Sequence, residues 1–73
     1  MTSEQYRHAI EHLGMTQVGS ARFFDVSDTT PRRWISGASP IPMAVEMLLC
    51  VMVHYDLTPH GVMAIAHRDR VAS

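Results

Sequence analysis

The chain has 73 residues, of which 47% are apolar, with one cysteine and a formal net charge of −1. This length allows a single domain, and the composition is typical of a globular chain rather than a disordered one. A lone cysteine excludes an internal disulfide framework and a cysteine-rich zinc site. The polar N-terminus shows no secretory signal and the longest apolar run, Met47 to Val53, is too short to span a bilayer, so we expect a cytoplasmic protein without membrane contact.

The N-terminal segment carries clear helix signals. Thr2 and Gln5 have the spacing of a capping box for a helix from Ser3 to His12. Gly14 supplies the stop at its C-terminal end. Three apolar residues share one face of this helix: Tyr6, Ile10 and Leu13.

A second helix is predicted from Gln17 to Phe24, with Thr16 as its cap. Gly19 weakens this helix by about 1 kcal/mol relative to alanine.

A third helix is predicted from Thr29 to Ser36, and Gly37 ends it. Proline is tolerated only in the first turn of a helix. We therefore expect Asp28 to be the N-cap, which places Pro31 at the third helical position, where no helical N–H is required.

A fourth helix is predicted from Met43 to Tyr55, with Pro42 at its first position. It is apolar on nearly every side, since Glu46 is its only charge, and such a helix must be covered on more than one side. We expect one face to close the core, through Met47, Leu48, Val51 and Tyr55. We expect Cys50 to be a buried, inert thiol.

A fifth helix is predicted to start at Thr58 and Pro59 and to fade near Arg68. The second face of the fourth helix, formed by Val45, Leu49 and Met52, needs cover. The fifth helix supplies it within the chain through Val62, Met63, Ile65 and Ala66, or a second subunit does so. In the latter case the expected homodimer interface comprises Leu49, Met52, Val62 and Ile65.

The segment from Met15 to Pro40 carries a recognisable motif. Its residues are Gln17-x-x-x-Ala21, then Val26-Ser27-x-x-Thr30-x-x-Arg33-Trp34-x-x-Gly37-x-x-Pro40. This pattern resembles the Cro/C1-type (XRE) helix-turn-helix family of small phage and bacterial repressors, in detail over residues 13–40 and loosely over the whole chain. The resemblance implies one all-α domain over residues 1–73, with a five-helix lambda-repressor-like fold and a central helix-turn-helix at about residues 16–37.

The resemblance also implies a function. The chain would bind double-stranded DNA sequence-specifically as a transcriptional regulator, expected to repress by occupying a promoter as a homodimer on a palindromic operator. The expected DNA contacts are Gln17, Ser27, Asp28, Thr29, Thr30, Arg32 and Arg33. Of these, Arg33 is expected to reach base edges or phosphate, Arg32 to hold phosphate, and Asp28 to cap the helix rather than read a base. No enzymatic activity, cofactor or metal is expected.

Net charge works against strong non-specific binding of DNA. DNA-binding domains are usually basic, whereas this chain carries −1 overall. Because site-specific binding needs only a local positive face, we expect weak attraction to random DNA rather than none.

Three positions depart from the family pattern. Asp25 stands where glycine is usual, and aspartate tolerates the left-handed backbone conformation better than most residues. Ser20 replaces a leucine, a loss that packing of Phe23 and Phe24 is expected to offset. Pro31 replaces an aliphatic core residue.

Two other functions remain open. The apolar helices at 43–55 and 59–68 could bind a different protein, as in an antitoxin-like or phage accessory protein. The run His8-x-x-Glu11-His12 matches an inverted zinc-peptidase pattern, which would require a third ligand and a larger scaffold. The polar face of an amphipathic helix explains the same residues.

Overall fold

A computed structural model describes residues 1–72, with side chains placed as far as Arg68. Over this range the chain is all-helical, with five helices and no strand. They are α1 (Ser3–His12), α2 (Gln17–Phe23), α3 (Thr29–Ser36), α4 (Met43–His54) and α5 (Pro59–Ala72). The predicted all-α class and the five helices are confirmed. Two of the helices end one residue earlier than expected, and the fifth continues past Arg68.

The helix starts follow the capping signals in the sequence. The capping box on α1 is formed: the Gln5 N–H donates to Thr2 Oγ1 at 3.1 Å, and the Thr2 N–H donates to Gln5 Oε1 at 2.9 Å. Thr16 caps α2 by accepting the Gly19 N–H at 2.9 Å, and Thr58 accepts the Gly61 N–H at 2.9 Å at the start of α5. Pro42 occupies the N-cap of α4 rather than its first helical position.

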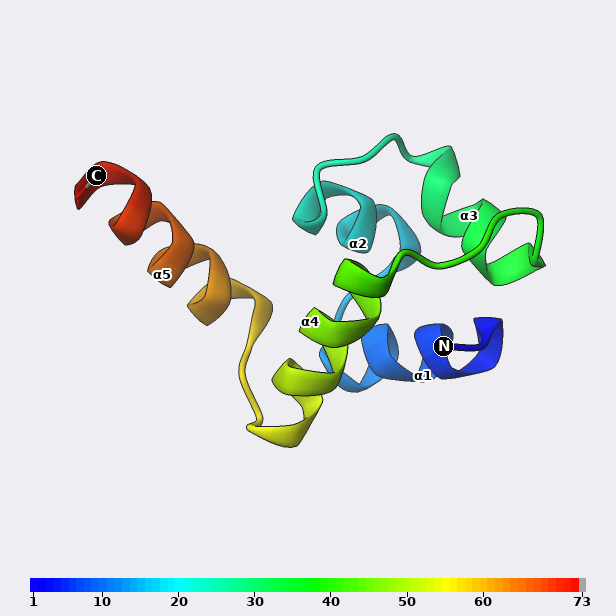
Figure 1. Cartoon of the computed structure of the whole chain (residues 1–73), viewed down its shortest axis with the longest axis horizontal. Coiled ribbons are helices and arrows are strands. Elements are labelled where there is room, and N and C mark those ends of the chain that lie inside the picture. The colour runs from blue at the N-terminus through cyan, green and yellow to red at the C-terminus, as the bar shows by residue number, and fades with distance from the viewer. Residues whose placement is uncertain (73) are drawn as a thin grey trace.

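The core lies where α1, α3 and α4 meet. Its buried residues are Tyr6, Ile10, Trp34 and Leu49. The closely packed helix pairs are α1–α3, α2–α3 and α1–α4. Figure 1 shows α1 to α4 gathered into one body, with α5 projecting from it after the bend that follows α4.

The orientation of α4 is the reverse of the expected one. Leu49 and Met52 are fully buried, whereas Met47 is 61% and Tyr55 68% exposed. Because α4 is apolar on nearly every side, its hydrophobic pattern does not indicate which face turns inward. Leu49 is buried beside Tyr6 and Ile10, so the face of α4 that carries Leu49 is the one that turns toward the core. Leu49 and Met52 are thus enclosed within the chain, and the expectation that they form a dimer interface is wrong.

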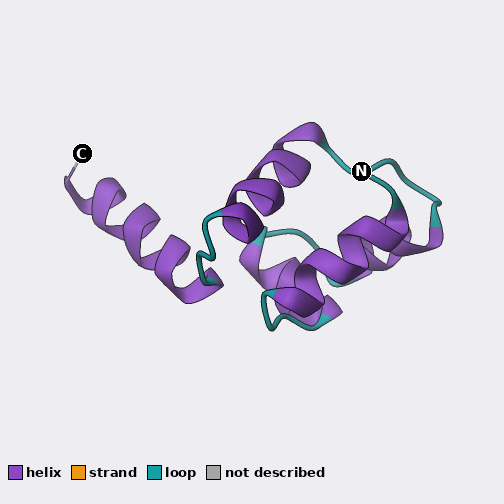
Figure 2. Ribbon diagram, turned by 90° about the horizontal axis from the view of Figure 1, so that it is seen from below, coloured by secondary structure: helices purple, strands orange, loops and turns teal. Residues whose placement is uncertain are grey.

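Helix α5 does not cover the outer side of α4. The two helix axes bend by 114° at the break between them, and Met63 and Ile65 stay about half exposed. Figure 2, seen from below, shows the same separation of α5 from the other helices. Val62 is half-buried and Ile65 is exposed. The contact of these two residues with a second subunit stays a prediction.

No single helix within residues 1–72 has the length and apolar character needed to cross a membrane. Only α4 and α5 taken together, as the bent pair, meet that criterion, and they do so by length and composition alone.

Candidate nucleic-acid interface

Local backbone hydrogen bonds and one small buried side chain shape the corner between α2 and α3. Ala21 is fully buried where the two helices pack, and its carbonyl accepts the Val26 N–H at 2.9 Å. Asp25 adopts φ of +57°, the left-handed conformation expected at this position. The Asp25 N–H donates to the Arg22 carbonyl at 3.2 Å. These bonds fix the direction in which α3 leaves the corner.

The inward face of α3 is held by Pro31 and Trp34, both buried. The Trp34 ring meets the Tyr6 ring edge-on at 5.4 Å and the Phe24 ring edge-on at 6.3 Å, measured between centroids. Ser3 Oγ donates to the Trp34 carbonyl at 2.7 Å. Contacts from α1 and from the end of α2 therefore prevent α3 from rotating about its own axis.

Ser20 joins α2 to α1 through a buried hydrogen bond. It is fully buried, and its hydroxyl accepts the Tyr6 hydroxyl proton at 2.8 Å while donating to the Gln17 carbonyl at 2.7 Å. Burial raises the pKa of the Tyr6 phenol, and the bond to Ser20 partly opposes that rise. The spacing of residues along the chain did not predict this contact between α1 and α2.

The outward face of α3 carries four exposed side chains: Thr29, Arg32, Arg33 and Ser36. Their spacing of three and four residues places them on one side of the helix, opposite Pro31 and Trp34. Within residues 1–68 the ion pairs join Met1 to Glu46 and Glu4 to Arg7 and His8, so neither arginine of this face is neutralised by an acid. The face is polar, positive and accessible.

Ser36 was not predicted as a member of this face. Its hydroxyl donates to the Arg33 carbonyl at 3.2 Å. The spacing from Thr29 and Arg33 was the signal that could have identified it.

The start of α3 brings three hydroxyl groups together. Ser27 Oγ lies 3.0 Å from Thr29 Oγ1 and 3.0 Å from Thr30 Oγ1. Asp28 occupies the N-cap position, and Pro31 accordingly takes the third position, as expected. The Asp28 side chain, however, makes no capping hydrogen bond and is exposed, so its predicted capping role is wrong. Asp28 has helical dihedral angles rather than the extended ones with which an N-cap side chain reaches back to its helix.

Gln17 and Arg22 lie on α2 and are exposed. Gln17 is the first residue of that helix, where backbone N–H groups and the helix dipole favour an anion. Arg22 borders a shallow hollow between α2 and the first turn of α5, together with Phe23 and Met63. Among the described side chains Arg22 has no ion pair with Asp25, the pairing that would have occupied it.

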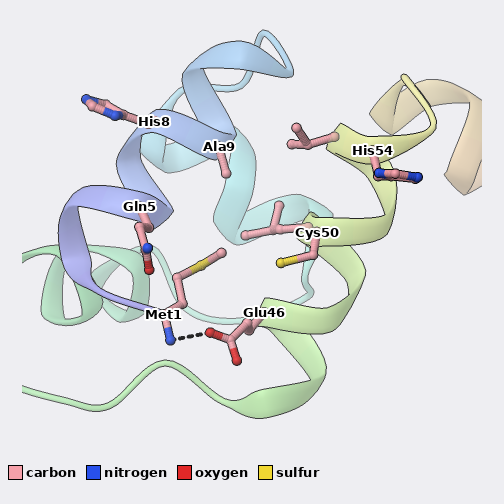
Figure 3. Close-up of a pocket in the computed structure, with 9 residues that line it drawn as sticks. Met1, Gln5, His8, Ala9, Glu46, Cys50 and His54 are labelled. Carbon is pink, nitrogen blue, oxygen red and sulfur yellow. Dashed lines mark ion pairs between the residues drawn. The ribbon is translucent and has the colours of Figure 1, made fainter.

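A second surface feature is a groove of about 650 Å³ between α1 and α4, shown in Figure 3. Cys50 lies on it and is exposed, so the expectation of a buried thiol is wrong. His8 and His54 point away from each other across the groove (Figure 3). No group of three or more His, Cys, Asp or Glu side chains in the described part of the chain is arranged to hold a metal ion.

Comparisons of the chain with protein-family models, with curated proteins and with solved structures find no match.

Proposed function

We propose that the chain binds double-stranded DNA in a sequence-specific manner as a transcriptional regulator of Cro/C1 type, with α3 as its recognition helix. The observation that carries the proposal is the division of α3 into two faces. Pro31 and Trp34 fasten one face to the body, while Thr29, Arg32 and Arg33 stand exposed on the other. In a helix-turn-helix motif, the first helix and the corner fix the direction of the second helix. The exposed face of the second helix then lies in the major groove of DNA.

The chemistry of the exposed face suits DNA. A guanidinium donates a forked pair of hydrogen bonds to the O6 and N7 acceptors of guanine, and Arg33 lies exposed on this face, about one helical turn after Thr29. Arg32 points about 100° around the helix from Arg33, toward the other side of the same face, and we assign it to the phosphate backbone. Thr29 and the hydroxyl cluster of Ser27 and Thr30 offer donors and a methyl group at the start of the helix.

The mechanism is occupancy. Insertion of α3 would cover a promoter and exclude polymerase, which requires no bond-breaking step and no cofactor. We also propose that the five helices form a lambda-repressor-like fold.

The test is selection from a random-sequence duplex library at low salt, followed by gel-shift titration of the enriched duplexes. We expect enrichment of an inverted repeat whose half-sites lie about 10 base pairs apart, centre to centre. Enrichment of no sequence, with no shift of any duplex at low salt, would overturn the proposal.

An interaction module for another protein is the second candidate. The exposed apolar side chains on α4 and α5 favour it. It predicts failure of the duplex selection together with a chain that stays monomeric by itself.

A further inference from the structure

The outer face of α1 carries two histidines that lie about one helical turn apart. His8 and His12 are four residues apart, and side chains at this spacing lie one above the other on a helix, with Cβ atoms about 5–6 Å apart. Both belong to regular α-helix, of which His12 is the last residue. The His8 side chain is 72% exposed and His12 is also exposed. Both rings are therefore accessible from solvent on the same side of α1.

This spacing allows two imidazoles to bind one metal ion. Zinc sites on helices use histidines four residues apart on one face, and each ring binds through one nitrogen at about 2.0–2.1 Å. Imidazole suits zinc, nickel and copper. Two rings fill two positions of the coordination shell, and water fills the others.

The surroundings of the pair favour a cation. His12 ends α1, where the helix dipole has its negative end. Glu11 lies next to His12 and has no ion pair among the described side chains. A carboxylate oxygen of Glu4 lies 3.9 Å from His8 Nε2. Carboxylates in such positions orient a metal-binding imidazole through its second ring nitrogen.

Other pairs of metal-ligating side chains are arranged less well. Cys50 and His54 are also four residues apart, but the Cys50 sulfur and the His54 ring point in different directions (Figure 3). The His54 ring also packs edge-on against Tyr55, at 4.7 Å between centroids. His60 and His67 lie seven residues apart on α5, about 10 Å along the helix axis, which is too far for one ion.

We propose that His8 and His12 bind one divalent ion of zinc, nickel or copper on the outer face of α1. The ion joins the last two turns of the helix. The site differs from a zinc-peptidase centre, because the described part of the chain holds no group of three metal-ligating side chains. It uses no residue of α3 and does not depend on DNA binding.

Titration calorimetry of the full chain with nickel chloride tests the pair. We expect one ion per chain, with Ni²⁺ bound more tightly than Co²⁺ or Mn²⁺. His8→Ala and His12→Ala should each weaken Ni²⁺ binding at least about 10-fold, because the advantage of two linked ligands is lost. His60→Ala and His67→Ala are matched controls and should bind as the wild type does.

Each outcome decides the proposal, because alanine is well tolerated in helices and the fluorescence of Trp34 reports whether each variant is folded. A wild-type chain that binds no Ni²⁺ at millimolar concentration would overturn it, as would wild-type affinity in both α1 variants. Loss of binding in Cys50→Ser, with wild-type affinity in His12→Ala, would place the ion on α4 and overturn the assignment.

Hydrogen exchange with Zn²⁺, which is diamagnetic, supplies an independent measurement. The Leu13 N–H donates to the Ala9 carbonyl at 3.1 Å at the end of α1. Saturating Zn²⁺ should slow exchange of this amide in the wild type, because an ion that joins the two histidines holds the last turn closed. It should leave the same amide unchanged in His12→Ala. An exchange rate at Leu13 that does not respond to Zn²⁺ in the wild type would contradict the proposal.

Discussion

Two regions of this molecule differ in the solvent exposure of their apolar side chains. In the body formed by α1, α2, α3 and the inner side of α4, apolar side chains such as Tyr6 and Trp34 are buried and the arginines are outside. In the outer side of α4 and in α5, the exposed residues include Met47, Tyr55 and Ile65.

Only the body has a packed interior of its own. Aromatic contacts and a buried hydrogen bond hold the body together, and the body presents a polar face on α3. The His54–Tyr55 ring contact of the outer region joins neighbouring residues and ties no two helices together.

Truncation of the central aromatic of the body should cost most. Trp34→Ala is expected to lower the free energy of unfolding by about 3–5 kcal/mol, because a large buried ring that touches Tyr6 and Phe24 is lost. The matched change in the outer region, Met47→Ala, should cost less than about 0.5 kcal/mol in dilute, monomeric protein. Urea unfolding followed by circular dichroism measures both. Similar losses in the two variants would remove the distinction between the regions.

Hydrogen exchange should show the same division without mutation. Backbone amides in the middle of α1 should open only with the whole body, whereas amides near Val62 in α5 should exchange roughly 100-fold faster in dilute protein. Uniform protection of α1 and α5 in the monomer would show that α5 is packed against the body.

The buried pair of hydroxyl groups should contribute about 1 kcal/mol. Tyr6→Phe removes the 2.8 Å bond to Ser20, and a double-mutant cycle with Ser20→Ala isolates the coupling between them. Tyr55→Phe, in the exposed outer region, is the control and should leave stability unchanged. A coupling energy near zero would show that the bond does not tie α1 to α2.

The same pair should make stability depend on alkaline pH. Burial raises the pKa of Tyr6 above its ordinary value of 10.0, so the unfolded chain loses the phenolic proton first. The stabilisation is complete below pH 10 and declines as pH rises through the raised pKa of the folded state. Tyr6→Phe should remove this decline and Tyr55→Phe should not. Identical alkaline profiles of wild type and Tyr6→Phe would contradict the assignment.

The smallest expected difference between the two regions is in the effect of replacing an aspartate that has a left-handed backbone conformation. Asp25 turns the chain between α2 and α3 at φ of +57°, and Asp56 turns it between α4 and α5 at +56°. Alanine tolerates this conformation less well, so Asp25→Ala should lower the free energy of unfolding by about 1 kcal/mol. Asp56→Ala should change it by less than about 0.3 kcal/mol in the monomer, because α5 belongs to none of the closely packed helix pairs. Equal effects would refute that difference.

Local signals allowed the helices to be predicted, because their causes lie within a few residues. The capping pairs at Thr2 and Thr16 and the stop at Gly37, which has φ of +84°, are set by neighbouring atoms. The left-handed turn at Asp25 is equally local.

The predictions were wrong where the structure depends on contacts between residues that are far apart in the sequence. The inward face of α4 was predicted wrongly because apolar residues surround that helix, and burial of Leu49 and Met52 depends on where α1 lies. Exposure of Cys50 follows from the same rotation. The Tyr6–Ser20 contact joins residues 14 apart, and no periodic pattern indicates it. The expected DNA contacts on α3 stay a prediction, although Arg32 and Arg33 are exposed as that prediction requires.

Substitution of Arg33 and of Arg32 tests whether α3 reads DNA through its outward face. Binding of the enriched duplex should weaken by about 1–3 kcal/mol in Arg33→Ala, with relaxed preference at one base pair in each half-site. Arg32→Ala should weaken operator and random duplexes alike and reduce the salt dependence by about one phosphate per subunit. Arg68→Ala, on the distant α5, is the control and should leave sequence preference unchanged. A folded Arg33→Ala variant with unaltered affinity and sequence preference would contradict the account.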